Sequence, residues 1–184
     1  MKKILVILSP GFEETEAITV VDVLRRAKLD VTTASLENNQ TVLGSHSIAV
    51  IADVSLSDIL SRAADTFDAI VLPGGMRGVE NMLDDQRVIE LVSSFAAQNK
   101  VTAAVCAGPL ILEKAGVLAE HSFTCHPCIF DRITSSNRLE KAAVVDRNVV
   151  TGRSAGCALA WALELAKILT PQADAIFPGL AFID

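Results

Sequence analysis

Aromatic side chains and long apolar stretches are scarce in this 184-residue chain. It has no tyrosine and one tryptophan, and aromatic residues make up 4% of it, against 51% for all hydrophobic residues. The apolar material is therefore aliphatic, and there is far more of it than a disordered chain carries. Apolar stretches such as residues 101–112 are shorter than the roughly 18 residues that span a membrane, and this one contains Gly108 and Pro109. We expect a folded, soluble protein that does not use a membrane as its partner.

Basic residues are also in short supply. The chain has 16 Lys and Arg against 22 Asp and Glu, which gives a formal net charge of −6, and the basic residues form no cluster. Nucleic acids and anionic membrane surfaces attract concentrated positive charge. The composition therefore argues against either of them as the main partner.

Signals for export and for disulfide bonding are missing as well. The apolar run at residues 4–8 stops at Ser9-Pro10-Gly11 and acids follow, which favours a buried first strand over a signal peptide. The four cysteines show no repeated disulfide spacing; they are Cys106, Cys125, Cys128 and Cys157. We expect one domain over residues 1–184, reduced and located in the cytoplasm.

Short aliphatic runs alternate with segments of helical periodicity, which predicts buried strands joined by helices. This βαβ pattern indicates an α/β protein, a three-layer sandwich with a mostly parallel sheet and helices on both faces. Residues 41–43 and 48–51 suggest a small antiparallel hairpin outside that sheet. The predicted strands cover residues 4–8, 31–34, 69–72, 101–105 and 149–151, and the predicted helices 17–26, 87–98 and 154–169.

Ligands of such sheets bind where strands end and helices begin, so we expect the site in the loops at those points. The loop of residues 10–16 has one glycine and three glutamates, which would repel a pyrophosphate and make nucleotide binding unlikely. Glu13 and Glu14 suit the positive end of a helix dipole. Glu16 precedes an apolar helix face and could point inward.

A cysteine follows the predicted strand at residues 101–105. Cys106-Ala107-Gly108 lies between that strand and a helix that starts with Pro109, which is the arrangement of a nucleophile elbow. The helix dipole favours a thiolate there, so we expect a Cys106 pKa below the roughly 8.5 of a free thiol. Backbone N–H groups at Gly74 and Gly75 could bind an oxyanion nearby, although a tight turn explains these glycines equally well.

The segment Cys125-His126-Pro127-Cys128 leaves three interpretations open. A zinc site would need a second ligand pair, and His46 and His121 have no matching spacing. A redox dithiol is a second interpretation. The third, which we prefer, makes His126 a base or orienting group for Cys106.

Five ordered motifs between Lys3 and about Leu169 resemble the ThiJ/PfpI superfamily, and within it the parkinsonism-associated deglycase branch, which includes the DJ-one and bacterial YajL proteins. Ala107 stands where the protease-like branch has a histidine after its nucleophilic cysteine, so a peptidase is disfavoured. The motifs are Pro10-Gly11 with Glu13-Glu14-Thr15-Glu16, residues 21–27 (VDVLRRA), residues 71–75 (VLPGG), residues 103–109 (AAVCAGP) and His126-Pro127.

The resemblance implies a flavodoxin-like fold, usually in a homodimer, with no organic cofactor and no metal. It makes Cys106 the reactive thiol, Glu16 a protonated carboxyl group hydrogen-bonded to it, and His126 a nearby third member. Backbone N–H groups of Gly75 and Ala107 would form the oxyanion site. His46 stands where some relatives have an arginine at the dimer interface.

Two functions fit these residues. The first is a glyoxalase III-type enzyme that converts methylglyoxal or glyoxal to 2-hydroxy acids without glutathione, or that removes early glyoxal adducts from protein side chains. The second is a redox-sensing stress-response protein or chaperone that acts through oxidation of Cys106. One reactive thiol serves both functions, so the sequence does not separate them.

Overall fold

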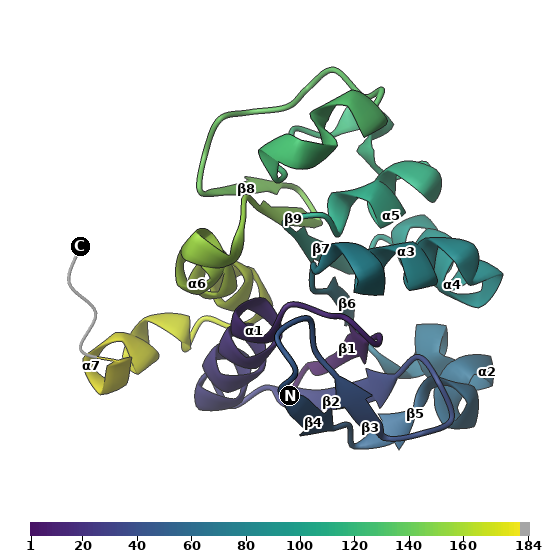
Figure 1. The fold of residues 1–184 in the computed structure, drawn as a ribbon. Coiled ribbons are helices and arrows are strands. Elements are labelled where there is room, and N and C mark those ends of the chain that lie inside the picture. Colours follow the sequence, from purple (N-terminus) through teal and green to yellow (C-terminus); the bar gives the residue numbers. More distant parts are fainter. Residues whose placement is uncertain (181–184) are drawn as a thin grey trace.

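The computed structural model describes residues 1–180, and a mostly parallel sheet runs through their centre (Figure 1). Seven strands pair in the order β5-β2-β1-β6-β7-β9-β8, and only β8 and β9 pair antiparallel. The predicted α/β sandwich with helices on both faces is confirmed. The strands of the sheet are β1 (Lys3–Leu8), β2 (Asp30–Ser35), β5 (Val54–Ser55), β6 (Ala69–Leu72), β7 (Val101–Val105), β8 (Ala143–Asp146) and β9 (Val149–Gly152).

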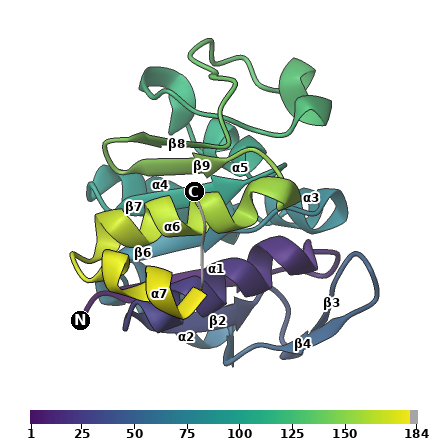
Figure 2. The same ribbon diagram turned by 90° about the vertical axis from the view of Figure 1, so that its left-hand side faces the viewer.

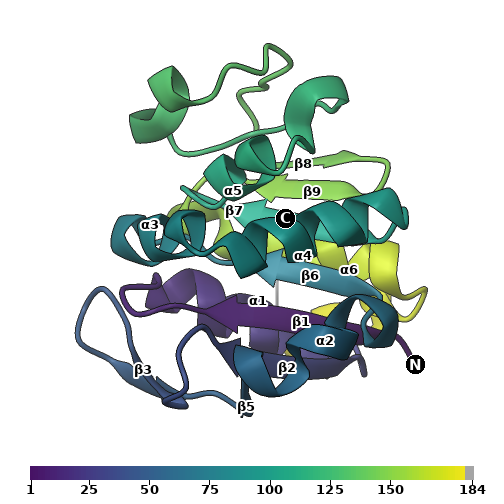
Figure 3. The ribbon, with the colours of Figure 1, turned by 90° about the vertical axis from the view of Figure 1, so that its right-hand side faces the viewer.

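Helices cover both faces of the sheet, as Figures 2 and 3 show from opposite sides. On one face α1 packs on α6, and on the other α4 packs on α2, α3 and α5. The α-helices are α1 (Glu14–Arg26), α2 (Leu56–Thr66), α3 (Met76–Asp84), α4 (Gln86–Ala97), α5 (Pro109–Lys114), α6 (Ala158–Leu169) and α7 (Phe177–Leu180). Short 3₁₀ helices are η1 (Leu118–Glu120), η2 (Pro127–Arg132), η3 (Ala155–Cys157) and η4 (Ala173–Ile176).

Two apolar layers, one on each side of the sheet, hold the helices in place. Five consecutive residues of β1, Ile4 to Leu8, are buried, and alternate residues enter opposite layers. Leu5 and Ile7 pack with the α2–α5 side, while Ile4 and Val6 pack with α1 and α6. Burial on both faces explains why this strand reads as a continuous aliphatic run.

The predicted hairpin is confirmed as β3 (Thr41–Leu43) and β4 (Ala49–Ile51), which pair antiparallel outside the main sheet. Its tip is tied to the loop after β1. The N–H of Gly11 donates to the carbonyl of Leu43, and the N–H of Ser45 donates to the carbonyl of Phe12, both at 2.8 Å. The hairpin therefore lies beside the loop that leads into α1.

All predicted strands and helices occur; β6 and β7 have the predicted bounds, and several other elements differ at their ends. The helix expected at residues 154–169 starts as η3, and α6 begins only at Ala158. The sequence did not predict β5, β8, α2, α3 or α7. The domain predicted over residues 1–184 extends past the described residues by its last four positions. Within residues 1–180, no helix combines the length and hydropathy needed to cross a bilayer.

Candidate active site

Three loops at the carboxyl ends of neighbouring strands bring Glu16, Gly74 and Cys106 together. Glu16 lies in the first turn of α1, after β1, and Gly74 and Cys106 follow β6 and β7. A Cβ added to Gly74 would lie 2.5 Å from Oε2 of Glu16 and 2.7 Å from Cβ of Cys106. The absence of a side chain at position 74 therefore lets the carboxyl group and the cysteine approach each other.

Cys106 has the backbone conformation expected of a nucleophile elbow. Its φ is 62°, in the left-handed region that residues other than glycine seldom adopt. Its N–H donates to the carbonyl of Gly152 at 3.0 Å, which fixes it to the end of β9. Gly108 packs so closely that a Cβ there would lie 2.7 Å from the carbonyl oxygen of Leu72. Such strained positions cluster at functional sites, where the surrounding structure holds them.

The two predicted oxyanion donors both face the thiol. The backbone N–H groups of Ala107 and Gly75 hydrogen-bond to Cys106. Gly75 has a φ of 87°, and a Cβ there would lie 2.3 Å from the carbonyl oxygen of Gly11, so only glycine fits. Two N–H groups directed at one sulfur can also reach an oxygen that develops on an atom bonded to that sulfur.

Glu16 is fully buried, although it is one of three glutamates in a short loop. Its Oε2 accepts a hydrogen bond from the N–H of Gly74 at 2.7 Å, and its Oε1 is buried without a hydrogen-bond partner of good geometry. Burial, opposed by the hydrogen bonds from Gly74 and Cys106, raises the pKa of Glu16 to about 7. A carboxyl group with that pKa exchanges its proton near neutral pH.

The expectation of a lowered Cys106 pKa is wrong. Burial, then the negative charge of Glu16 and the hydrogen bond to it, raise the pKa of the Cys106 thiol, and the N–H groups of Ala107 and Gly75 offset only part of this. Because the two groups interact so strongly, they titrate as a pair. The pair loses one proton near pH 7 and holds the second much more tightly.

His126 lies next to Cys106 through its backbone and not through its ring. Its N–H donates to the carbonyl of Cys106 at 2.9 Å. The ring Nδ1 lies 2.9 Å from Sγ of Cys128 and accepts from the N–H of Cys128 at 3.1 Å. Across residues 1–180 no hydrogen bond joins the His126 ring to the Cys106 thiol, so its predicted role as a base for Cys106 stays a prediction.

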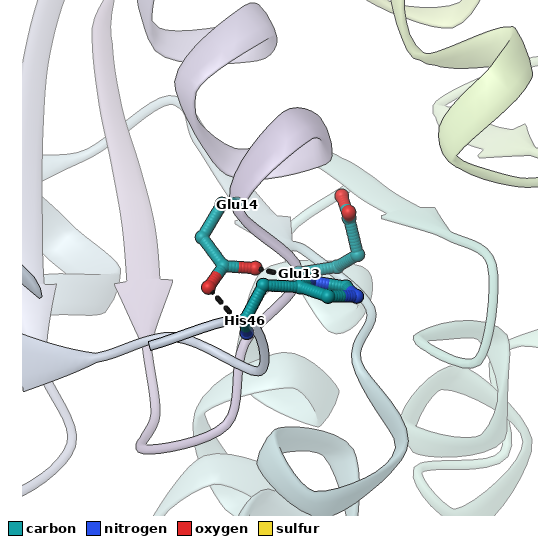
Figure 4. A group of neighbouring side chains, drawn as sticks. All are labelled: Glu13, Glu14 and His46. Atoms are coloured by element: carbon teal, nitrogen blue, oxygen red, sulfur yellow. Dashed lines mark hydrogen bonds and ion pairs between the residues drawn. The ribbon is translucent and has the colours of Figure 1, made fainter. Parts of the chain in front are cut away.

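Glu14 has a role that the sequence reading missed. It is buried, and its carboxylate accepts from the N–H of His46 at 2.6 Å, from Oγ of Ser45 at 3.0 Å, and contacts Nδ1 of His46 at 3.0 Å (Figure 4). Burial alone would raise the pKa of Glu14, but these hydrogen bonds outweigh it and lower the pKa to about 2. Glu14 therefore anchors the hairpin tip, whereas the predicted dipole role alone would leave it at the surface.

One group of His, Cys, Asp or Glu side chains among the described residues is close enough to hold a metal ion. It consists of Glu13, Glu14 and His46, whose possible ligand atoms lie within 4.8 Å of one another. Glu13 caps α1 by accepting from the N–H of Glu16 at 2.7 Å. Both oxygens of Glu14 already accept hydrogen bonds from the hairpin. A cation would have to displace those donors, so the group is better explained as an anchor.

Comparisons with known proteins identify the family. The family profile described as the DJ-1/PfpI family matches residues 2–168. Protein dj-1beta of Drosophila melanogaster is 38% identical over 170 residues, which is 91% of this chain and 89% of that protein. A deglycase of Pyrococcus abyssi is 31% identical over 169 residues, 91% of this chain and 99% of that protein.

The fold is shared with solved structures. The structure titled as oxidized Toxoplasma gondii DJ-1 has a TM-score of 0.93 at 31% identity and covers 100% of both chains. By contrast, the chain spans only 37% and 45% of the length of DJ-1 homologs B and A of Arabidopsis thaliana. Because the family profile matches nearly its whole length, this chain belongs to the DJ-1/PfpI family.

Proposed function

We propose that this protein uses Cys106 to convert small 2-oxoaldehydes such as methylglyoxal and glyoxal to 2-hydroxy acids without glutathione, with removal of early glyoxal adducts from protein side chains as a related activity. A similar protein from Pyrococcus abyssi, 31% identical, is named a deglycase. The observation that carries the proposal is a strained cysteine whose thiol meets two backbone N–H groups and a buried carboxyl group with a pKa of about 7.

The reaction begins with one proton held by the pair of Glu16 and Cys106. Ionised Glu16 takes the proton of the Cys106 thiol as the sulfur attacks the aldehyde carbon. A C–S bond forms, and the carbonyl oxygen becomes an oxyanion next to the N–H groups of Gly75 and Ala107. Glu16 gives its proton to this oxygen, which yields a hemithioacetal.

The remaining steps are proton transfers followed by hydrolysis. Glu16, now ionised, removes the hydrogen of the former aldehyde carbon as a proton and returns a proton to the neighbouring carbon. The hydroxyl proton on the first carbon passes to the oxygen of the second, so that the first carbon is oxidised and the second reduced. The product of this transfer is a thioester of Cys106. Water then cleaves the C–S bond, which releases the 2-hydroxy acid and restores the thiol, so no external oxidant or reductant is needed.

A second function, redox sensing through Cys106, is supported by a different observation. A similar solved structure is titled as the oxidized form of Toxoplasma gondii DJ-1. A sulfinate at Cys106 would place its oxygens next to the N–H groups of Gly75 and Ala107, which would stabilise the added charge. In this role the protein would need no turnover.

Lactate formation from methylglyoxal by purified protein, without glutathione, tests the proposal. The wild type should produce lactate, and Cys106→Ser should lose activity because a serine hydroxyl is a far weaker nucleophile. Glu16→Gln should lose about 10²- to 10⁴-fold, since an amide cannot transfer the proton. A Cys106→Ser variant that keeps wild-type turnover would refute Cys106 as the nucleophile, and a wild type without turnover would refute the enzyme function and favour the sensor.

The proposal includes a homodimer and a cytoplasmic location. Ile18, Leu43, Ile48 and Ile51 expose 47%, 52%, 56% and 75% of their surface, and all four lie on α1 or on the β3–β4 hairpin that Glu14 ties to it. Exposed apolar side chains grouped in this way are typical of protein–protein contact surfaces. The four cysteines are all free thiols, which suits a reducing compartment.

A further inference from the structure

The four free cysteines differ sharply in what surrounds them. Cys125 is fully buried, and burial raises its pKa to about 11. Cys106 and Cys157 are partly buried, and the hydrogen-bond partner of Cys157 is the Ser154 hydroxyl at 3.8 Å, which is not a base. Of the four cysteines, Cys128 alone is exposed. It is therefore the thiol that a reagent in solution can reach most easily.

Cys128 also has an imidazole at its sulfur. Nδ1 of His126 lies 2.9 Å from Sγ of Cys128. The same Nδ1 accepts a hydrogen bond from the backbone N–H of Cys128 at 3.1 Å, so it carries a lone pair and not a hydrogen in this arrangement. The sulfur must then be the donor, S–H to Nδ1. This is the geometry in which an imidazole takes the proton of a thiol.

The short segment that holds this pair is fixed at both ends. The N–H of His126 is bonded to the carbonyl of Cys106, and Pro127 starts the 3₁₀ helix η2 directly after it. Ile129, the next residue after Cys128, is buried. The backbone on both sides of the His126 ring and the Cys128 sulfur is thus anchored, while Cys128 itself is exposed.

We propose that Cys128 is a second nucleophilic thiol, activated by His126, that forms reversible mixed disulfides with small disulfides such as glutathione disulfide. His126 Nδ1 takes the proton from Sγ, and the thiolate attacks one sulfur of the disulfide. A new S–S bond forms at Cys128, the original S–S bond breaks, and the leaving thiolate takes the proton from His126. The small disulfide is the oxidant, since one of its sulfurs leaves as a thiol while Cys128 is oxidised.

This site is separate from the proposed chemistry of Cys106. It needs neither Glu16 nor the oxyanion donors, and its substrate is a disulfide and not an aldehyde. The shared element is His126, whose backbone contacts Cys106 and whose ring contacts Cys128. Failure of aldehyde turnover would therefore leave the reactivity of Cys128 unaffected.

Reaction of the purified, reduced protein with glutathione disulfide at pH 7 tests the proposal, with mass spectrometry of intact protein and of non-reduced peptides. The wild type and Cys106→Ser should each take up the first glutathione at Cys128, and Cys128→Ser should not be modified at that position. His126→Asn is the matched change. Its Oδ1 can still accept from the N–H of Cys128 as an N-cap, but it is no base, so exchange should slow about tenfold.

Two results would overturn the proposal. One is a first adduct on Cys106 or Cys157, and the other is an unchanged exchange rate at Cys128 in folded His126→Asn. If that variant does not fold, labelling of the wild type with iodoacetamide replaces it. In the folded protein, the labelling rate of Cys128 divided by that of Cys157 should be well above the same ratio in urea, where both residues are ordinary thiols. The same ratio in the folded protein and in urea would contradict the proposal.

Discussion

Replacing Glu16 with glutamine should change how the folding stability of this protein depends on pH. Burial raises the pKa of Glu16 from 4.5 to about 7, so between these values the folded protein holds a proton that the unfolded chain has released. The native state binds more protons in this window, and the free energy of unfolding therefore falls as the pH rises through it. Glutamine is neutral at every pH and removes this dependence.

The size of the effect follows from the change in pKa. From 4.5 to about 7, at about 1.4 kcal/mol for each pH unit, the wild type should lose roughly 3 kcal/mol of stability. Glutamine keeps the shape of the side chain. Its Oε1 can accept from the N–H of Gly74, as Oε2 of Glu16 does at 2.7 Å, and its Nε2 can donate toward the Cys106 thiol.

Urea unfolding at pH 4 and pH 8 measures the difference directly. The stability of Glu16→Gln relative to wild type should rise by roughly 3 kcal/mol from the lower to the higher pH. Glu90→Gln, the same chemical change on the exposed side of α4, should show no such trend. A difference between Glu16→Gln and wild type that is the same at both pH values would mean that Glu16 is an ordinary carboxylate, and the proposed proton transfer would lose its basis.

The remaining predictions concern the hairpin, the glycines and the dimer. Glu14→Gln should lower the free energy of unfolding in urea by about 1–3 kcal/mol at pH 6, because an amide has one acceptor oxygen where the carboxylate has two. This difference from the wild type should shrink as the pH falls from 4.5 and vanish below about 2, where Glu14 becomes protonated. Gly74→Ala should abolish lactate formation, since its Cβ would meet Glu16 and Cys106. The control is Gly116→Ala, where φ is 75° and the space around the residue is open; this variant should keep its activity, and its free energy of unfolding in urea should fall by only about 1 kcal/mol. Ile51→Lys should shift sedimentation toward the monomer mass of 19.5 kDa, and an unchanged dimer would exclude Ile51 from the interface.

Much of the fold could be predicted because buried parallel strands leave a clear aliphatic signal. The strand at Lys3–Leu8 is buried on both sides and reads as an unbroken apolar run. The edge strand β8 has only one fully buried residue, Val144, and β5 is two residues long, so neither leaves such a run. The start of α2 did carry a signal, because Ser55 and Asp58 have capping-box spacing and the N–H of Ser55 donates to the Asp58 carboxylate at 3.3 Å.

The candidate site could be predicted as a set of residues but not as a set of protonation states. Strand ends and glycines predicted that Cys106 lies near the loop of Gly74 and Gly75, because the carboxyl ends of parallel strands share one edge. The pairing of Gly75 with Ala107 as oxyanion donors came from the family resemblance. The pKa of Cys106 could not be obtained in this way. Burial and the charge of Glu16 raise it, and both depend on the distance between two loops that are far apart in the sequence.

Glu14 and Glu16 make the same point within a single helical turn. Both are buried in the first turn of α1, so both experience the same helix dipole, yet the pKa of Glu14 falls to about 2 and that of Glu16 rises to about 7. The dipole therefore does not decide their charge. Glu14 meets polar groups of Ser45 and His46 within 3.0 Å. Glu16 has one N–H at 2.7 Å and the Cys106 thiol, and its Oε1 has no partner of good geometry. The number of donors that the surrounding loops supply keeps Glu14 an anion down to about pH 2 and leaves Glu16 able to gain and lose a proton near neutral pH.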